Sequence, residues 1–102
     1  MKKIVNGKLY NTETAQFICN YETPGDIGDF YYFEESLYKK KTGEFFLSGH
    51  GGPASKYGTY NSYDTIAGGD RITPLSLKEA ERWLEKHGDV ETYIELFGEP
   101  EE

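Results

Sequence analysis

Groups that could carry out acid–base or metal chemistry are scarce in this chain. Its 102 residues include two histidines and one cysteine, and His, Cys, Asp and Glu do not cluster at metal-ligand spacing. His50 could act as a base with Glu34 or Glu35, yet an ordinary loop histidine is the simpler interpretation because no nucleophile lies near it in sequence. We therefore expect no enzyme activity, no metal and no cofactor.

A glycine cluster around His50 is a candidate ligand-binding loop. In Gly49-His50-Gly51-Gly52-Pro53, the backbone N–H groups of His50, Gly51 and Gly52 could converge on an anion such as a nucleotide phosphate. The segment lacks the GxxxxGK(S/T) spacing of phosphate loops. The glycines would equally allow the loop to pass close over an aromatic hairpin.

Aromatic and acidic side chains supply two further candidates. Tyr57, Tyr60 and Tyr63 recur every third residue among Ser, Gly and Asn, a composition typical of adaptable recognition loops. Folding back onto the core is an equal alternative for these tyrosines. Glu34 and Glu35 interrupt an aromatic strand. Because successive side chains of a strand point to opposite faces, we expect one of the two carboxylates to be paired or poised in a site.

The net charge of −7 is concentrated near the C-terminus. Residues 76–102 hold nine acids and three bases, a balance of −6, so the rest of the chain is almost neutral. Such a surface repels nucleic-acid phosphates and favours a basic protein partner, with a solvated helix face as the alternative. The residues 39–41 are three lysines at a predicted turn, too few for strong duplex binding. The candidate partner-binding residues are Glu81, Glu85, Glu91 and Glu95.

The strands that would position these residues follow from alternation and turn signals. Asn6-Gly7 predicts a tight hairpin turn between two short strands. Alternation over 15–21, broken only at Ile18, predicts a strand with one covered face. The aromatic segment 29–40 and residues 44–48, joined by a glycine-containing turn, predict a second hairpin.

Two short helices are expected at the C-terminal end. Ser76 and Glu79 match a capping box that begins the first helix, and Gly88 would supply a left-handed stop. Asp89 would cap the second helix. Apolar residues that share a face of each helix should pack on the sheet: Leu77, Ala80, Trp83 and Leu84 in the first, and Val90, Tyr93, Ile94 and Phe97 in the second.

These elements predict one α+β domain over residues 1–102. A small antiparallel sheet of about four to five strands, arranged as a hairpin meander, would pack against the two C-terminal helices. The predicted parts are β-hairpins at 1–48, a Gly/Tyr-rich loop at 49–71, a strand end and two helices at 72–98, and an acidic tail at 99–102.

The sequence contains no export or membrane signal that we recognise. No apolar stretch approaches the roughly 18 to 20 residues of a membrane helix, and Met1-Lys2-Lys3 leads into a polar turn rather than an apolar signal core. Cys19 is the single cysteine, and a small buried apolar side chain is its favoured interpretation. We expect a cytoplasmic protein, and its aromatic side chains would permit a homodimer.

A wider pattern of residues covers nearly the whole chain. It includes Asn6-Gly7-Lys8-Leu9-Tyr10-Asn11-Thr12-Glu13-Thr14-Ala15, Asp29-Phe30, Glu34-Glu35-Ser36-Leu37-Tyr38, Thr42-Gly43-Glu44-Phe45-Phe46-Leu47, Gly49-His50-Gly51-Gly52-Pro53, Ser55-Lys56-Tyr57, Ile72-Thr73-Pro74-Leu75-Ser76, Glu79-Ala80 and Trp83-Leu84-Glu85. The pattern resembles a family of small proteins carried by phages and integrative elements of Firmicutes and their relatives, most specifically from Glu34 to Pro53. That family is similar to one of the type II-A anti-CRISPR families, which are inhibitors of Cas9.

The resemblance implies a non-enzymatic accessory protein that binds a component of bacterial defence, with Cas9 as the implied target in the host cytoplasm. It transfers no catalytic residues to this chain. An acidic helical surface would suit such a target, because Cas9 holds its nucleic acids in strongly positive channels. The alternative function is a small-ligand binder that sequesters a nucleotide signal through the glycine loop.

Overall fold

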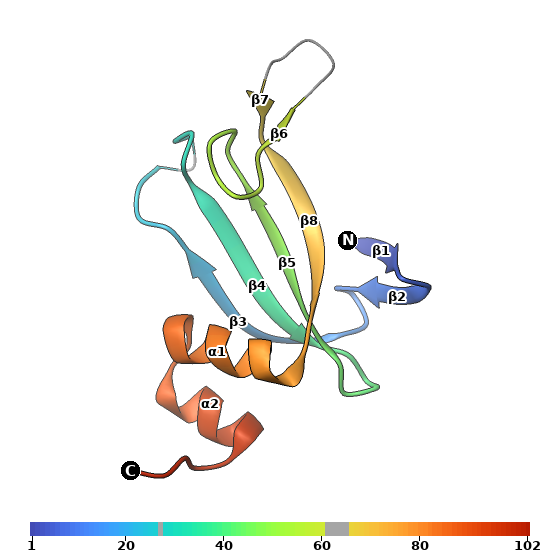
Figure 1. The fold of residues 1–102 in the computed structure, drawn as a ribbon, viewed down its shortest axis with the longest axis vertical. Coiled ribbons are helices and arrows are strands. Elements are labelled where there is room, and N and C mark those ends of the chain that lie inside the picture. Colours follow the sequence, from blue (N-terminus) through green and yellow to red (C-terminus); the bar gives the residue numbers. More distant parts are fainter. Residues whose placement is uncertain (27, 61–65) are drawn as a thin grey trace.

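The computed structural model describes residues 1–26, 28–60 and 66–102 and confirms the predicted α+β class (Figure 1). Its elements are β1 (Lys2–Val5), β2 (Lys8–Asn11), β3 (Gln16–Glu22), β4 (Phe33–Lys39), β5 (Phe45–Gly51), β6 (Thr59–Tyr60), β7 (Ile66–Ala67), β8 (Gly69–Leu75), α1 (Leu77–His87) and α2 (Val90–Phe97). Strands β3, β4, β5 and β8 form an antiparallel sheet in that order. Strands β1–β2 and β6–β7 are separate two-stranded ribbons.

The β4–β5 hairpin lies at the centre of the sheet, as predicted from the aromatic segments. Its turn closes where the Lys40 N–H donates to the Glu44 carbonyl at 2.7 Å, and Gly43 adopts a φ of 95° that favours glycine. The first strand of the hairpin begins at Phe33 rather than at residue 29. Residues 29–32 instead form a turn, because the Asp29 carboxylate accepts the Tyr31 N–H at 2.7 Å.

Two smaller features were also visible in the sequence. Asn6 and Gly7 have φ angles of 52° and 78°, as the predicted hairpin turn between β1 and β2 requires. In β3, the register with β4 shifts between Phe17 and Cys19. The residue that broke the alternation, Ile18, therefore occupies a β-bulge.

The glycine-rich segment is more regular than predicted. Strand β5 continues to Gly51, and β8 starts at Gly69, so both ends of the expected irregular loop belong to the central sheet. Gly49 pairs with residues on both neighbouring strands, and a Cβ on it would overlap with the Tyr57 ring. The structure thus confirms the alternative in which glycines let the chain pass closely over the hairpin.

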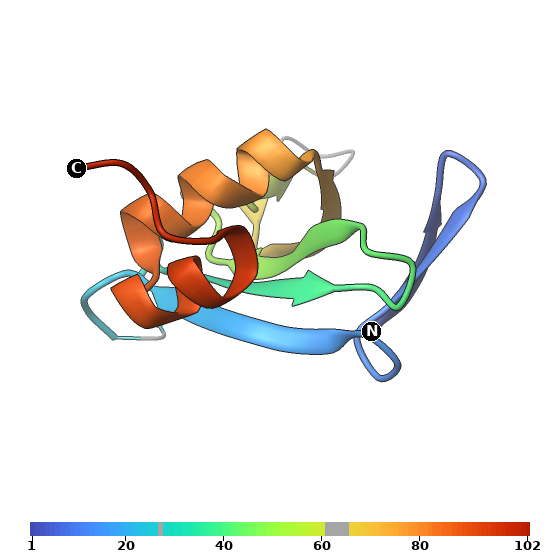
Figure 2. The ribbon, with the colours of Figure 1, turned by 90° about the horizontal axis from the view of Figure 1, so that it is seen from below.

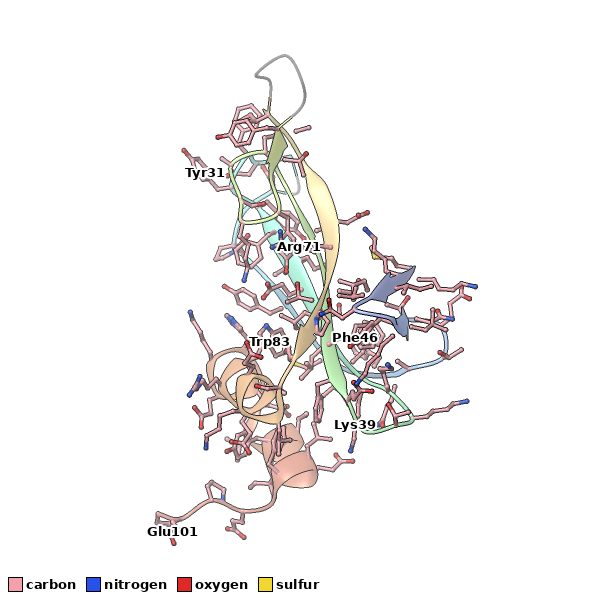
Figure 3. All side chains as sticks on the ribbon, turned by 45° about the vertical axis from the view of Figure 1, so that its right-hand side comes forward. Tyr31, Lys39, Phe46, Arg71, Trp83 and Glu101 are labelled. Carbon is pink, nitrogen blue, oxygen red and sulfur yellow. The ribbon has the colours of Figure 1, made fainter. Side chains whose placement is uncertain are left out.

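The sheet carries a separate apolar cluster on each face. Successive residues of β5 point in opposite directions, so Phe45 faces the helices and Phe46 faces the β1–β2 hairpin. Figure 3 shows Trp83 and Phe46 on these two sides of the sheet, and Figure 2 shows the helices and the β1–β2 hairpin at opposite sides of the molecule. The helix side buries Leu37, Phe45, Leu47, Ala80, Trp83 and Leu84, whereas the hairpin side buries Tyr10, Phe46 and Ile72.

Helix α1 begins at the predicted capping box. The Ser76 hydroxyl accepts the Glu79 N–H at 3.1 Å, and the Glu79 carboxylate accepts the Ser76 N–H at 2.8 Å. At the other end, Gly88 does not form the predicted left-handed stop, because its φ of −97° is extended. A Cβ at Gly88 would lie 2.5 Å from Leu84, so glycine is needed here for close packing rather than for a positive φ.

Helix α2 begins after Asp89 as predicted, although the Asp89 side chain makes no capping hydrogen bond. The helix ends at Gly98, whose φ is 84°. Two apolar residues predicted to pack on the sheet do not do so: Leu77 and Val90 are 60% and 70% exposed. Each is the first residue of its helix, where the chain has not yet turned onto the sheet.

No helix in the described part of the chain is long and apolar enough to cross a membrane.

Candidate functional site

A hollow with a mainly apolar lining lies between the two helices. It lies where α1 ends and α2 begins, and the tail that follows α2 closes one side. Its volume is about 250 Å³. Two carboxylates, Glu85 and Asp89, stand among otherwise apolar or small lining residues. The hollow is lined by Leu84, Glu85, Gly88, Asp89, Val90, Tyr93, Ile94 and Pro100.

The sequence forms this hollow because the connection between the helices is short. The Gly88 N–H donates to the Leu84 carbonyl at 2.8 Å, which ends α1, and Asp89 leads directly into α2. Tyr93 and Phe97 pack toward the helix-side core and fix the position of α2. Val90, at the start of α2, is left exposed at the rim of the hollow.

Of the four acidic residues predicted to bind a partner, Glu85 lines this hollow and the other three lie on the same two helices. Glu81 and Glu85 are one helical turn apart on α1. Burial of Tyr93 on α2 raises the pKa of its phenol, and the negative charges of Glu81 and Glu85 raise that pKa further. Glu91 and Glu95 are likewise one turn apart on α2 and are exposed. None of the four forms an ion pair within the described residues. Their charge is therefore free to act on a partner.

Helix α1 is not uniformly acidic, which the charge balance of the sequence did not reveal. Lys78, Arg82 and Lys86 follow one another at intervals of four residues and so form a basic stripe along the helix. Arg82 and Lys86 line a separate open hollow with Lys56 from the loop after β5. The acidic surface thus consists of one side of α1 together with α2 and the tail.

The adjacent pair Glu34 and Glu35 divides between the two faces of the sheet, as expected. Glu35 is 1% exposed. Its carboxylate accepts hydrogen bonds from Tyr57 Oη at 2.6 Å, Trp83 Nε1 at 3.0 Å and Lys56 Nζ at 2.6 Å. Burial raises the pKa of Glu35, but the hydrogen bonds from Lys56, Tyr57 and Trp83 outweigh burial and leave that pKa below its usual value.

The Glu35 cluster has a structural consequence, because its partners come from three parts of the chain. Lys56 and Tyr57 belong to the loop after β5, and Trp83 belongs to α1. Burial, followed by the hydrogen bond to Glu35, raises the pKa of Tyr57, so this phenol stays a donor at neutral pH. The prediction that one of the two glutamates is paired is confirmed, because the Glu35 carboxylate has three donors within the chain.

The two described tyrosines of the predicted recognition surface differ in exposure. Tyr57 is 3% exposed and belongs to the core, which corrects its assignment as a surface residue. Its ring lies against the glycine backbone of β5, because only glycine leaves room for it there. Tyr60, in contrast, is 81% exposed. Tyr63 lies outside the described residues.

The predicted ligand loop around His50 is used for internal contacts. His50 lies on β5 opposite Glu34 on β4, and its Nε2 is 2.7 Å from Glu34 Oε1. Gly51 belongs to the strand, and the Gly52 N–H donates to the Tyr32 carbonyl at 2.8 Å. These amide groups therefore do not converge on an anion. The described residues contain no group of three or more His, Cys, Asp or Glu side chains placed to hold a metal ion.

Cys19 is half-buried beside the helix-side core, close to its predicted environment. Burial raises the pKa of its thiol, which keeps the side chain in its less reactive form.

Comparisons with protein-family models, curated proteins and solved structures gave no match.

Sequence reasoning missed the hollow, although it named residues on both sides of it. The apolar positions of α2 were interpreted as one stripe that faces the sheet, whereas Val90 and Ile94 line the hollow. A signal was present in the short connection at Gly88-Asp89, which forces the two helices to meet at an angle. The depth of the resulting hollow depends on packing that a helical pattern does not encode.

Proposed function

We propose that this protein is a non-enzymatic accessory protein that binds a partner protein through the hollow between α1 and α2. The observation that carries the proposal is the combination of an apolar centre with unpaired carboxylates around it. Protein interfaces are commonly built from an apolar centre and a polar rim. The partner would insert an apolar side chain between basic residues that face Glu81, Glu85, Glu91 and Glu95.

The size of the hollow supports a protein partner over a small ligand. Sites for drug-sized molecules usually enclose about 300–1,000 Å³. The hollow measures about 250 Å³ and is open to solvent, so it suits one anchoring side chain of a larger surface. Charge around an interface adds attraction at a distance and selects against acidic competitors.

We further propose that the partner is a component of bacterial defence in the host cytoplasm, with Cas9 as the first candidate. The resemblance of the sequence to a type II-A anti-CRISPR family supports this choice. The acidic surface also supports it, because Cas9 presents strongly positive channels in which the guide and target strands lie. An acidic protein that occupies such a channel would block nucleic-acid binding without chemistry of its own.

The experiment is target-DNA cleavage by a Cas9–guide complex in the presence of increasing amounts of the protein, added before or after the DNA. Dose-dependent protection is the expected result, and protection only when the protein is added first would indicate a block of DNA loading. The variant E81K/E85K/E91K/E95K should lose protection while its circular dichroism stays unchanged. Absence of protection across several Cas9 orthologues would overturn the choice of Cas9. Full activity of the charge-reversed variant would overturn the proposal that the acidic surface binds the partner.

A further inference from the structure

A second charged surface lies away from the proposed partner site and has the opposite sign. The β1–β2 hairpin and the β4–β5 turn bring together residues 1–15 and 39–44, which contain six lysines and two glutamates, a formal balance of +4. Lys8 Nζ lies 3.0 Å from Glu44 Oε2, so the hairpin and the turn are in direct contact. We name this surface the lysine cluster, formed by Lys2, Lys3, Lys8, Lys40 and Lys41, whereas Lys39 extends along the helix side, with its Nζ 5.6 Å from the centre of the Phe45 ring.

The lysine cluster is held in place by an aromatic ring. Tyr10, on β2 opposite Lys3, is buried against Phe46, and Lys40 Nζ lies 4.2 Å from the centre of the Tyr10 ring. Lys40 is thereby fixed between the ring and Glu44, with 16% of its side chain exposed. Lysines 2, 3 and 41 form no ion pair with a described residue. Their charge is available to a ligand.

Two adjoining hollows lie between the β4–β5 turn and the chain that joins β2 to β3, beside the hairpin lysines, and no carboxylate lines them among the described residues. Lys40 and Lys41 line both hollows, and the side-chain amides of Asn11 and Gln16 add hydrogen-bond donors. Ammonium groups and amide donors are the groups that contact phosphate oxygens in nucleic-acid complexes. A concave basic surface suits a narrow row of phosphates better than the flat surface of a membrane.

An exposed aromatic side chain stands beside the hollows. Phe17 lines neither hollow itself, but it lies on the edge strand β3 two residues after Ala15, which lines both, and it is 55% exposed, with its ring against Tyr38 at a centroid distance of 5.8 Å. A basic groove next to an exposed aromatic ring is the combination that proteins use for single-stranded nucleic acid, in which bases are free to stack. A duplex would offer no unstacked base to this ring.

The acidic C-terminal part does not cancel the lysine cluster. Figure 2 shows the β1–β2 hairpin and the C-terminal tail at opposite sides of the molecule. Figure 3 likewise places Glu101 far below the hairpin. Exposed charges in about 0.15 M salt are largely screened beyond about 8 Å. The net charge of −7 therefore understates the local attraction for an anion.

We propose that the lysine cluster binds the phosphate backbone of single-stranded nucleic acid, with Phe17 stacking on one base. This inference uses a different surface from the proposed protein-binding site and does not depend on it. Its ligand was not apparent from the sequence, because the three lysines of residues 39–41 are too few alone. The fold adds three more from the N-terminal hairpin.

The test is fluorescence anisotropy of the full-length protein with a labelled oligo(dT) strand of about 16 nucleotides. Salt would be varied from about 50 to 200 mM, and affinity should fall as salt rises, because bound phosphates release counterions. The variant K3Q/K41Q should bind about tenfold more weakly, and the slope of log affinity against log salt should flatten by about 1.4. F17L should weaken binding to the single strand but not to a duplex.

The matched control is K78Q/K86Q, which removes the same charge from α1 and should leave binding and its salt dependence unchanged. Thermal melting of each variant would establish that the fold is retained. If both double substitutions weakened binding to oligo(dT) equally, the effect would come from net charge alone, and the assignment of the binding site to the lysine cluster would be overturned. Absence of saturable binding at the lowest salt would overturn the proposal. Stronger binding to vesicles of anionic phospholipid than to oligo(dT), lost in K3Q/K41Q, would also overturn it in favour of a membrane ligand.

Discussion

The indole Nε1 of Trp83 donates a 3.0 Å hydrogen bond to the carboxylate of Glu35, which joins the middle of α1 to the central strand β4. The two residues are 48 positions apart in the chain. Glu35 is the one buried charged side chain in the described part of the core, and it also holds Lys56 and Tyr57. The packing of helix, loop and sheet therefore converges on a single carboxylate.

Replacing Glu35 with glutamine should destabilise the fold. The change removes the charge that strengthens three hydrogen bonds, and the cost should be about 2–3 kcal/mol of unfolding free energy. The matched control is Glu34→Gln on the neighbouring position, where the exposed pair with His50 contributes less than about 1 kcal/mol. Urea denaturation of both variants would measure the difference, and equal stability of the two would contradict the role of Glu35.

The same carboxylate should make stability depend on pH. The pKa of Glu35 in the folded protein lies below its ordinary value of 4.5, so its stabilising contribution is complete above that value and is lost as pH falls through the folded pKa. The difference in unfolding free energy between wild type and Glu35→Gln should therefore shrink below about pH 4. Glu44 and Glu79, whose pKa values are also lowered, are present in both proteins. A constant difference from pH 7 to pH 3 would argue against an ionised Glu35.

Gly49 should not tolerate even alanine. A Cβ at this position would overlap with the buried Tyr57 ring, and relief would require movement of the loop that carries Tyr57. Overpacking of this kind costs about 1–3 kcal/mol. Gly28→Ala is the control, because a Cβ at Gly28 meets no atom within 4 Å. Thermal melting of both variants would test this, and an unchanged melting temperature for Gly49→Ala would contradict the close packing.

The two helix starts should differ in their sensitivity to alanine. Ser76→Ala removes a complete capping box and should cost about 1 kcal/mol. Asp89→Ala removes no side-chain capping hydrogen bond and should therefore cost less than Ser76→Ala. Chemical denaturation would compare them. A larger effect of Asp89→Ala would show that its side chain caps α2 in solution.

Local signals predicted the elements of the fold well. Asn6-Gly7 specified its turn, the aromatic segments specified the central hairpin, and the Ser76 capping box specified the start of α1. These features succeed because each is decided by a few neighbouring residues. The edge strand β8 was less visible, because half of it consists of residues with little strand preference that pair with a fully formed β5.

The candidate sites were harder to predict because they depend on distant residues. The sequence was equally compatible with a surface and a core position for Tyr57, and its buried contacts with Glu35 and Gly49 decide for the core. The lysines of the β1–β2 hairpin and those of the β4–β5 turn are about thirty residues apart in sequence and meet only in the folded chain. The exposure of Val90 likewise follows from its place as the first residue of α2 rather than from helical periodicity.

The hollow between the helices can be tested with two equivalent substitutions. Val90 and Leu77 are each the first residue of a helix, and both are largely exposed, so replacement by lysine costs little packing and disturbs the two helix dipoles alike. Of these two residues, Val90 lines the hollow and Leu77 does not. Val90→Lys places a positive charge where a basic partner would insert its anchor, and it should weaken binding to the Cas9–guide complex by at least about tenfold in surface plasmon resonance. Leu77→Lys should bind as the wild type does. Equal loss in both variants would assign the effect to the helix starts, and no loss in either would place the partner elsewhere on the surface.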